Sequence, residues 1–235
     1  ESVLSDRNVI GVDLDPLAVM IAKVKTAPLN LPNCAQIGDK VLETARKTIV
    51  SGKVDKLDGL YAPSADELFD YWFEKETIRE LAALAKAIKD VEETTLSVFL
   101  QVVFSSAIIT KNGALTRARD LAHSRPHRDL KRQVTQSALD VFAKRLRATI
   151  ESLESMADLS ARALVIRSDT RSLPLRANSV DLIVTSPPYA ANAIDYMRGH
   201  KFSLMWLGYD PKYLTDTRKK YIGSELRATD LEFSS

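Results

Sequence analysis

The residues whose types and spacing most clearly suggest chemistry form the run Thr185-Ser186-Pro187-Pro188-Tyr189. Its two adjacent prolines fix two φ angles and remove two amide donors, so the loop is stiff and its carbonyl groups face outward without competing N–H groups. Ser186 adds a hydroxyl group, and Tyr189 adds an aromatic face. Such a loop can accept hydrogen bonds from an –NH2 group while the ring stacks on the planar system that carries the amine.

Three short apolar segments are predicted to form buried parallel strands, and they comprise residues 8–13, 163–169 and 180–185. Each is rich in β-branched residues and ends at a polar residue, which is typical of a strand that is covered on both faces. Ligands of open α/β sheets bind beyond the carboxyl ends of the strands. The motif directly follows the third segment, and this position favours a binding site over a simple turn or a polyproline segment.

The first predicted strand leads directly into a helix, because Asp15 can cap a helix, Pro16 suits its first position and Pro28 ends it. Residues 29–160 then show an almost entirely helical pattern, and one helix is expected over about residues 130–156. Two apolar helix faces stand out, formed by Leu81, Leu84, Ala85 and Ile88 and by Leu96, Phe99, Leu100, Val103, Phe104, Ala107 and Ile108. These patterns predict an α/β sheet with a large helical insert between two of its strands.

The composition is that of an ordinary globular chain and excludes several classes of protein. The 235 residues are 45% hydrophobic and 27% charged, which excludes a disordered chain and a collagen-like fibre. Cys34 is the only cysteine, so neither an intrachain disulfide nor a four-thiolate metal site can form, and a reducing cytosol is the expected location. No apolar run reaches the roughly 20 residues of a membrane-spanning helix, so no membrane partner is expected. A net charge of +2 limits any nucleic-acid surface to a local patch.

The apolar segment followed by Ser-Pro-Pro-Tyr resembles the target-amine motif of S-adenosylmethionine-dependent amino-methyltransferases that act on DNA. The residues that lead up to the motif are similar too, namely Ser-Asp at 168–169, Leu-Pro at 173–174 and Ser-Val-Asp-Leu-Ile-Val at 179–184. Residues 11–16, Gly-Val-Asp-Leu-Asp-Pro, resemble the second strand of the same fold. The resemblance implies a partial class I methyltransferase (Rossmann-like) sheet, built from residues 1–30 and 160–235. Residues 31–159 would form the helical insert, as a DNA-recognition or clamp region.

The resemblance also implies roles for residues at the strand ends. Asp13 would accept hydrogen bonds from the ribose hydroxyl groups of S-adenosylmethionine, and Asp169 would accept one from its adenine amine. The other cofactor-binding residues would be Leu14, Thr170 and Thr185, and the catalytic residues would be Ser186, Pro187, Pro188 and Tyr189. A turn or capping carboxylate is the alternative for Asp13, and a solvated loop acid near Arg167 and Arg171 is the alternative for Asp169.

The implied reaction is methyl transfer to the exocyclic amine of a flipped-out DNA base. This amine is a poor nucleophile because its lone pair is delocalised into the ring. Hydrogen bonds to Ser186 and to the Pro187 carbonyl would favour a pyramidal nitrogen aimed at the sulfonium methyl group. The resemblance also implies that serine at the first motif position favours cytosine N4 over adenine N6. Two alternatives are an RNA or protein-glutamine N-methyltransferase and a non-catalytic helical binding module with a vestigial methyltransferase half.

The sequence departs from the family at its glycine-rich cofactor loop, which has no counterpart among the eight glycines of the chain. We expect that loop just upstream of Glu1, and strands after the target motif are missing as well. The chain would therefore be a fragment, one subunit of a split enzyme or a decayed homologue. A missing segment or a second chain would supply the loop, and the chain alone would bind cofactor weakly and lack activity.

A weaker candidate for DNA contact is a basic stretch, for which a solvated helix face and linker is the alternative. Its members are Arg117, Arg119, Arg125, Arg128, Lys131 and Arg132. His123 and His127 lie in the same stretch, but no carboxylate or thiol completes a metal-ligand set there, so no metal is expected.

Overall fold

The computed structural model describes residues 2–52, 60–110, 115–119, 127–128, 136–155, 161–186 and 196–221. Within them, β1 (Val9–Asp13) and β4 (Ala163–Arg167) form a small parallel sheet. The two strands pair in register from Val9 opposite Ala163 to Asp13 opposite Arg167. Two of the three predicted strands are thereby confirmed, and their carboxyl ends lie at the same edge of the sheet.

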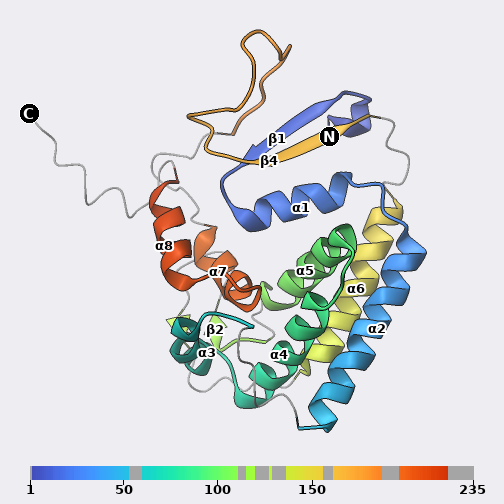
Figure 1. The fold of residues 1–235 in the computed structure, drawn as a ribbon, viewed down its shortest axis with the longest axis vertical. Helices are drawn as coiled ribbons and strands as arrows, with labels where there is room; N and C mark the ends of the chain where they lie inside the picture. The colour runs from blue at the N-terminus through green and yellow to red at the C-terminus, as the bar shows by residue number, and fades with distance from the viewer. Residues whose placement is uncertain are drawn as a thin grey trace, which may run out of the picture.

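Helix α1 (Pro16–Thr26) follows β1 after a short turn and starts as the sequence predicts. Asp15 is the N-cap residue, and Pro16 occupies the first helical position, where its missing N–H group costs no hydrogen bond. In Figure 1, α1 lies along one face of the two strands and separates them from α5 (Thr94–Ile108). Its buried side chains Leu17, Met20 and Val24 belong to the same hydrophobic core as the helices beneath it.

The described part of residues 29–160 is predominantly helical, as predicted. Besides α5 it contains α2 (Leu31–Val50), α3 (Asp66–Trp72), α4 (Lys75–Lys89) and α6 (Ala138–Glu154), together with the short 3-10 helix η3 (Pro63–Ala65). A short antiparallel pair is formed by β2 (Ala118–Arg119) and β3 (His127–Arg128). None of the described helices is long and apolar enough to cross a membrane.

Helix α6 begins later than the predicted start near residue 130, because Ser137 caps it. The Ser137 hydroxyl accepts a hydrogen bond from the N–H group of Leu139 at 3.2 Å. Glu80 of α4 accepts hydrogen bonds from the Ser137 hydroxyl at 3.0 Å and from the backbone N–H of Ala138. A residue of the neighbouring helix α4 therefore helps to fix the residue at which α6 starts. The hydrophobic pattern of α6 itself does not indicate this start.

Two further helices, α7 (Met197–Trp206) and α8 (Pro211–Lys219), lie side by side at one flank of the molecule (Figure 1). A short 3-10 helix, η1 (Val3–Ser5), precedes β1. Trp206, at the end of α7, is fully buried and stacks on Phe69 of α3 with 3.9 Å between ring centroids and 12° between ring planes. This stacking joins the C-terminal helix pair to the helical core.

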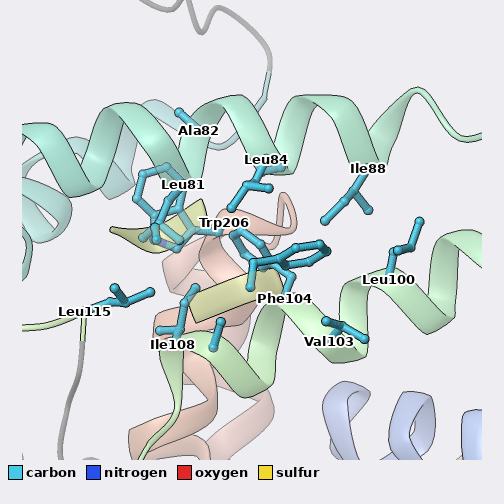
Figure 2. Packing of buried hydrophobic residues seen from close by; sticks show 14 of the residues in the cluster. Leu81, Ala82, Leu84, Ile88, Leu100, Val103, Phe104, Ile108, Leu115 and Trp206 are labelled. Atoms are coloured by element: carbon cyan, nitrogen blue, oxygen red, sulfur yellow. The ribbon is translucent and has the colours of Figure 1, made fainter. Parts of the chain in front are cut away.

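The hydrophobic core includes buried residues from all the helices α1 to α8, and Figure 2 shows from close by the part between α4, α5 and α7. Leu84 and Ile88 of α4 face Leu100 and Phe104 of α5, with Trp206 between them. All members of the two apolar helix faces found in the sequence are buried. The prediction of both core-facing stripes is thus confirmed.

The third predicted strand is wrong, because residues 180–185 form no strand. Leu182, Ile183 and Val184 are 70%, 78% and 82% exposed. A strand needs a neighbour to pair its N–H and C=O groups, and within the described ranges no strand lies beside this segment. The apolar side chains of this segment are therefore not buried by any described part of the chain.

A close crossing of α2 and α6 yields the first testable prediction. A Cβ atom on Gly38 would lie 2.8 Å from Cδ1 and 3.2 Å from Cγ of the buried Leu146. We expect Gly38→Val to lower the free energy of unfolding in urea by about 1–3 kcal/mol, because the added methyl groups overpack this contact. In the double variant Gly38→Val, Leu146→Ala, the smaller alanine makes room for the valine. The loss in the free energy of unfolding should therefore be smaller than the sum of the two single losses. Strictly additive losses would contradict the close contact.

Candidate functional site

The last residue of β1, Asp13, is the first predicted cofactor residue. Asp13 is exposed, and its Oδ1 accepts a 2.8 Å hydrogen bond from the backbone N–H of Asp15. This bond fixes the carboxylate at the strand end, while Oδ2 has no hydrogen-bond partner among the described residues. The neighbouring Leu14 contributes its carbonyl oxygen, which accepts a hydrogen bond from Nε of Arg167 at 3.2 Å. An exposed carboxylate held in this way can accept hydrogen bonds from ligand hydroxyl groups.

The turn after β4 carries the second predicted acid. The N–H group of Ser168 donates to the Asp13 carbonyl at 3.1 Å, so Asp13 at the end of β1 and Asp169 just after β4 lie at the same edge of the sheet. The Asp169 carboxylate accepts hydrogen bonds from the backbone N–H of Arg171 at 3.0 Å and from its Nε at 2.9 Å, and it pairs with Nη2. This hydrogen bond and the negative charge raise the pKa of Arg171. A ligand amine at Asp169 would share the carboxylate with Arg171, whereas the adjacent Thr170 is exposed.

Asp15 is the most constrained acid of this region, with 4% of its surface exposed. Its Oδ1 accepts hydrogen bonds from the N–H groups of Leu17 at 2.8 Å and Ala18 at 3.2 Å. Its Oδ2 lies 2.8 Å from Nδ1 of His200 and accepts a 2.8 Å hydrogen bond from the Tyr221 hydroxyl. Burial raises the pKa of Asp15, but the hydrogen bond and charge of His200 and the hydrogen bonds from Tyr221 and Ala18 outweigh burial, so the pKa lies below its ordinary value.

Arg167, the last residue of β4, links the strand end to α8. Its guanidinium carbon lies 5.5 Å from the ring centroid of Tyr213, and its Nη2 donates a hydrogen bond to the Tyr213 hydroxyl. Together with the hydrogen bond from Nε to the Leu14 carbonyl, these contacts place a cation beside the end of β1, where Asp13 lies. The edge of the sheet therefore presents both an acceptor and a positive charge.

The Ser-Pro-Pro-Tyr motif is described only in part. Residues 168–186 leave the sheet as an extended excursion without helix or strand (Figure 1). Thr185 and Ser186, at its end, are exposed, and no hydrogen bond or ion pair among the described residues joins them to Asp13 or Asp169. Pro187, Pro188 and Tyr189 lie outside the described residues.

The basic stretch is likewise described in part. Arg117 donates its backbone N–H to the carbonyl of Trp72 at 2.8 Å, which ties the start of this stretch to α3. Arg119 and Arg128 lie in the β2–β3 pair, where Arg128 is opposite Ala118. The remaining three candidates, Arg125, Lys131 and Arg132, lie outside the described residues. The prediction that this stretch contacts DNA stays a prediction.

Sequence reasoning identified Asp15 as a helix cap but missed its partners. His200 and Tyr221 are separated from Asp15 by 185 and 206 residues in the chain. No local spacing signals a contact over such a distance. The sequence showed only that Asp15 precedes a helix. This position accounts for the hydrogen bonds of Oδ1 but not for those of Oδ2.

Comparison with known proteins adds a likeness in sequence. The chain is 24% identical over 220 residues to the type II methyltransferase M.MvaI of Kocuria varians. The match covers 88% of this chain and 47% of that protein, so the chain spans about half the length of the relative it matches. No protein-family model matches the chain, and no solved structure matches it significantly. The relative belongs to the class of enzyme, the methyltransferases, that the Ser-Pro-Pro-Tyr motif resembles.

The hydrogen bonds of Asp15 yield a prediction on stability and pH. We expect Asp15→Asn to lower the free energy of unfolding by about 1–3 kcal/mol near neutral pH, because His200 and Tyr221 lose a charged acceptor. The pKa of Asp15 is lowered by folding, so its carboxylate contributes stability above the ordinary value of 3.8 and loses it as the pH falls through the lower folded value. The difference between wild type and variant should therefore shrink below about pH 4.

Urea denaturation across this pH range measures the effect. Asp210→Asn is the matched control, because Asp210 caps α8 through the N–H groups of Lys212 and Tyr213. Since Asp210 lies at the surface, its substitution should cost less than that of Asp15. Equal losses for the two variants, or a loss at Asp15 that does not change with pH, would contradict the assignment.

Proposed function

We propose that this chain forms part of a DNA methyltransferase that transfers a methyl group from S-adenosylmethionine to the exocyclic amine of a flipped-out base. The observation that carries the proposal is the parallel alignment of β1 and β4 in a chain similar to a type II methyltransferase. That alignment puts Asp13 and Asp169 behind neighbouring strand ends, the edge where such sheets bind ligands. Cytosine N4 is the preferred target and adenine N6 the second, because the motif begins with Ser186.

The residues at this edge have the chemistry that S-adenosylmethionine requires. Oδ2 of Asp13 is available to vicinal ribose hydroxyl groups, because the Asp15 N–H holds the other oxygen. Asp169 would accept a hydrogen bond from the adenine amine while it keeps its pair with Arg171. Leu14, Thr170 and Thr185 complete the proposed cofactor set. When bound, S-adenosylmethionine supplies an electrophilic methyl group on its sulfonium.

The target amine would be held by the motif. Ser186 and the Pro187 carbonyl would accept its two N–H hydrogen bonds, Pro188 would keep the loop stiff, and Tyr189 would stack on the base. Two acceptors at fixed positions aim the nitrogen lone pair, and correct orientation of two reactants supplies a large part of a rate enhancement. The base must leave the duplex to reach such a loop. The six basic residues of the 117–132 stretch would contact the DNA backbone.

The proposal includes a further polypeptide segment or a second chain that supplies the glycine-rich loop. One face of β1 and β4 is covered by α1, but Ile10 and Leu164, which lie opposite each other in the register, are 41% and 56% exposed. Apolar parallel strands are normally buried on both faces. Together with the exposed residues 182–184, these side chains leave apolar surface that an additional strand and helix would cover.

Methylation of candidate acceptors tests the function. The chain, extended by the proposed upstream segment with the glycine-rich loop, is incubated with tritiated S-adenosylmethionine and with DNA, RNA or protein. We expect label in DNA, on cytosine N4, and a loss of about 100-fold for Ser186→Ala because the amine loses one of its acceptors. Ser179→Ala, a matched serine whose hydroxyl donates to the Arg176 carbonyl, should keep wild-type activity. Label in RNA or protein alone, or equal activity of Ser186→Ala and wild type, would contradict the proposal.

Cofactor binding gives a separate prediction. Calorimetry should show weak binding of S-adenosylmethionine to this chain alone and tighter binding once the upstream segment is present. In the longer protein, Asp13→Asn should weaken binding by about tenfold to a hundredfold, because a charged acceptor contributes about 1.5–3 kcal/mol to a hydrogen bond. Tight binding by the isolated chain would show that no further segment is needed, and unchanged affinity of the Asp13 variant would remove Asp13 from the site.

A further inference from the structure

The Asp15 carboxylate does more than cap a helix. Capping of α1 uses Oδ1 alone, through the N–H groups of Leu17 and Ala18. Oδ2 points to two side chains from other parts of the fold, His200 in the first turn of α7 and Tyr221 after α8. The His200 side chain is 17% exposed and that of Asp15 is 6% exposed, so both groups of this pair are largely withdrawn from water.

Removing one member of a largely buried polar cluster is destabilising, but such a cluster as a whole is not more stabilising than an apolar one. Apolar residues of similar size would pack as well, because burying a charge and its partner costs desolvation free energy that their attraction only about offsets. What such a cluster provides is a fixed geometry, since hydrogen bonds near 2.8 Å tolerate little displacement. The three side chains therefore lock the first turn of α1, the start of α7 and the chain after α8 to one point.

Asp15, at the centre of this cluster, is directly hydrogen-bonded to Asp13, the predicted cofactor-binding residue. The backbone N–H of Asp15 donates to Oδ1 of Asp13, so a shift of Asp15 changes the orientation of the Asp13 carboxylate. On the other side, α7 is the helix that follows the Ser-Pro-Pro-Tyr motif along the sequence. The cluster thus joins the strand end that carries Asp13 to the element that comes after the target loop.

We propose that Asp15, His200 and Tyr221 are positioning residues that hold Asp13 in a fixed geometry relative to α7. This inference rests on the proposed function, in which Asp13 binds the methyl donor and the motif holds the acceptor amine. Methyl transfer requires the two reacting atoms to meet at about 3–3.5 Å, and a misplacement of about 1 Å can cost about 100-fold in rate. Loss of the cluster therefore lowers kcat more than it weakens the binding of DNA.

The first test measures steady-state methylation in the protein with its upstream segment. We expect His200→Ala to lower kcat about tenfold or more and to change the KM for DNA less than twofold. His200→Asn, whose side-chain amide can place an N–H group where Nδ1–H of His200 lies, should restore most of the kcat. Tyr221→Phe, which removes only one donor, should have a smaller effect. Ser155→Ala, at an exposed serine whose hydroxyl donates to the Ser152 carbonyl at the end of α6, is the control and should equal wild type.

The second test does not depend on methylation. In carboxyl-labelled protein, the ¹³C resonance of the Asp13 side chain, assigned with Asp13→Asn, should move in His200→Ala and return toward its original position in His200→Asn. If the chemical shift of the Asp13 side chain is the same in His200→Ala as in wild type, the inference is overturned. A His200→Ala enzyme with wild-type kcat would overturn it as well. If the resonance responds but no variant and no wild-type protein methylates any acceptor, the proposed function fails while the geometric link between His200 and Asp13 is supported.

Discussion

The parallel pairing of β1 with β4 is the interaction on which the rest of the arrangement depends. The two strands are separated in the sequence by all the helices from α1 to α6, so their pairing closes a very long loop. The entropic cost of closing a flexible loop grows slowly, by about 0.6 kcal/mol for each doubling of its length. Within this loop the described helices α2, α4, α5 and α6 pack in one hydrophobic core together with α1, and this packing offsets the entropic cost. A helical body of this size can therefore stand between two adjacent strands without preventing their pairing.

Helix α1 transmits this constraint from the sheet to the helices. One side of α1 covers β1 and β4, and its buried residues also join the core that contains α5. Because Asp15 caps α1 and its N–H group orients Asp13, the position of the helix also sets the position of the carboxylate at the strand end. His200 and Tyr221 add a second attachment at the same residue. The end of β1 that carries Asp13 is thus fixed from the helical side of the molecule.

Elements whose determinants are local could be predicted from the sequence, and elements that depend on a distant neighbour could not. The cap at Asp15, the apolar faces of α4 and α5 and the two strands that end at Asp13 and Arg167 were all recorded in short patterns. The start of α6 was missed because Glu80 of another helix helps to set it. Residues 180–185 have a strand pattern but no adjacent strand among the described residues. At the site, the sequence was sufficient to predict that Asp13 and Asp169 lie at strand ends. The pairs Asp169–Arg171 and Asp15–His200 depend on side-chain positions, which the sequence pattern does not contain.

The two halves of the described structure differ in how completely they bury apolar surface. The helical half encloses Phe99, Phe104 and Trp206 without exposure, whereas the sheet exposes Ile10 and Leu164. Local opening of a protein costs least free energy where buried apolar contacts are few. The sheet edge with Asp13 and Asp169 therefore opens at a lower free energy than the helical core.

A ligand that binds only the ordered edge loses affinity in proportion to the fraction of molecules in which that edge is disordered. Covering the exposed face of β1 and β4 would therefore raise the affinity of any ligand that binds this edge, without a new contact to that ligand.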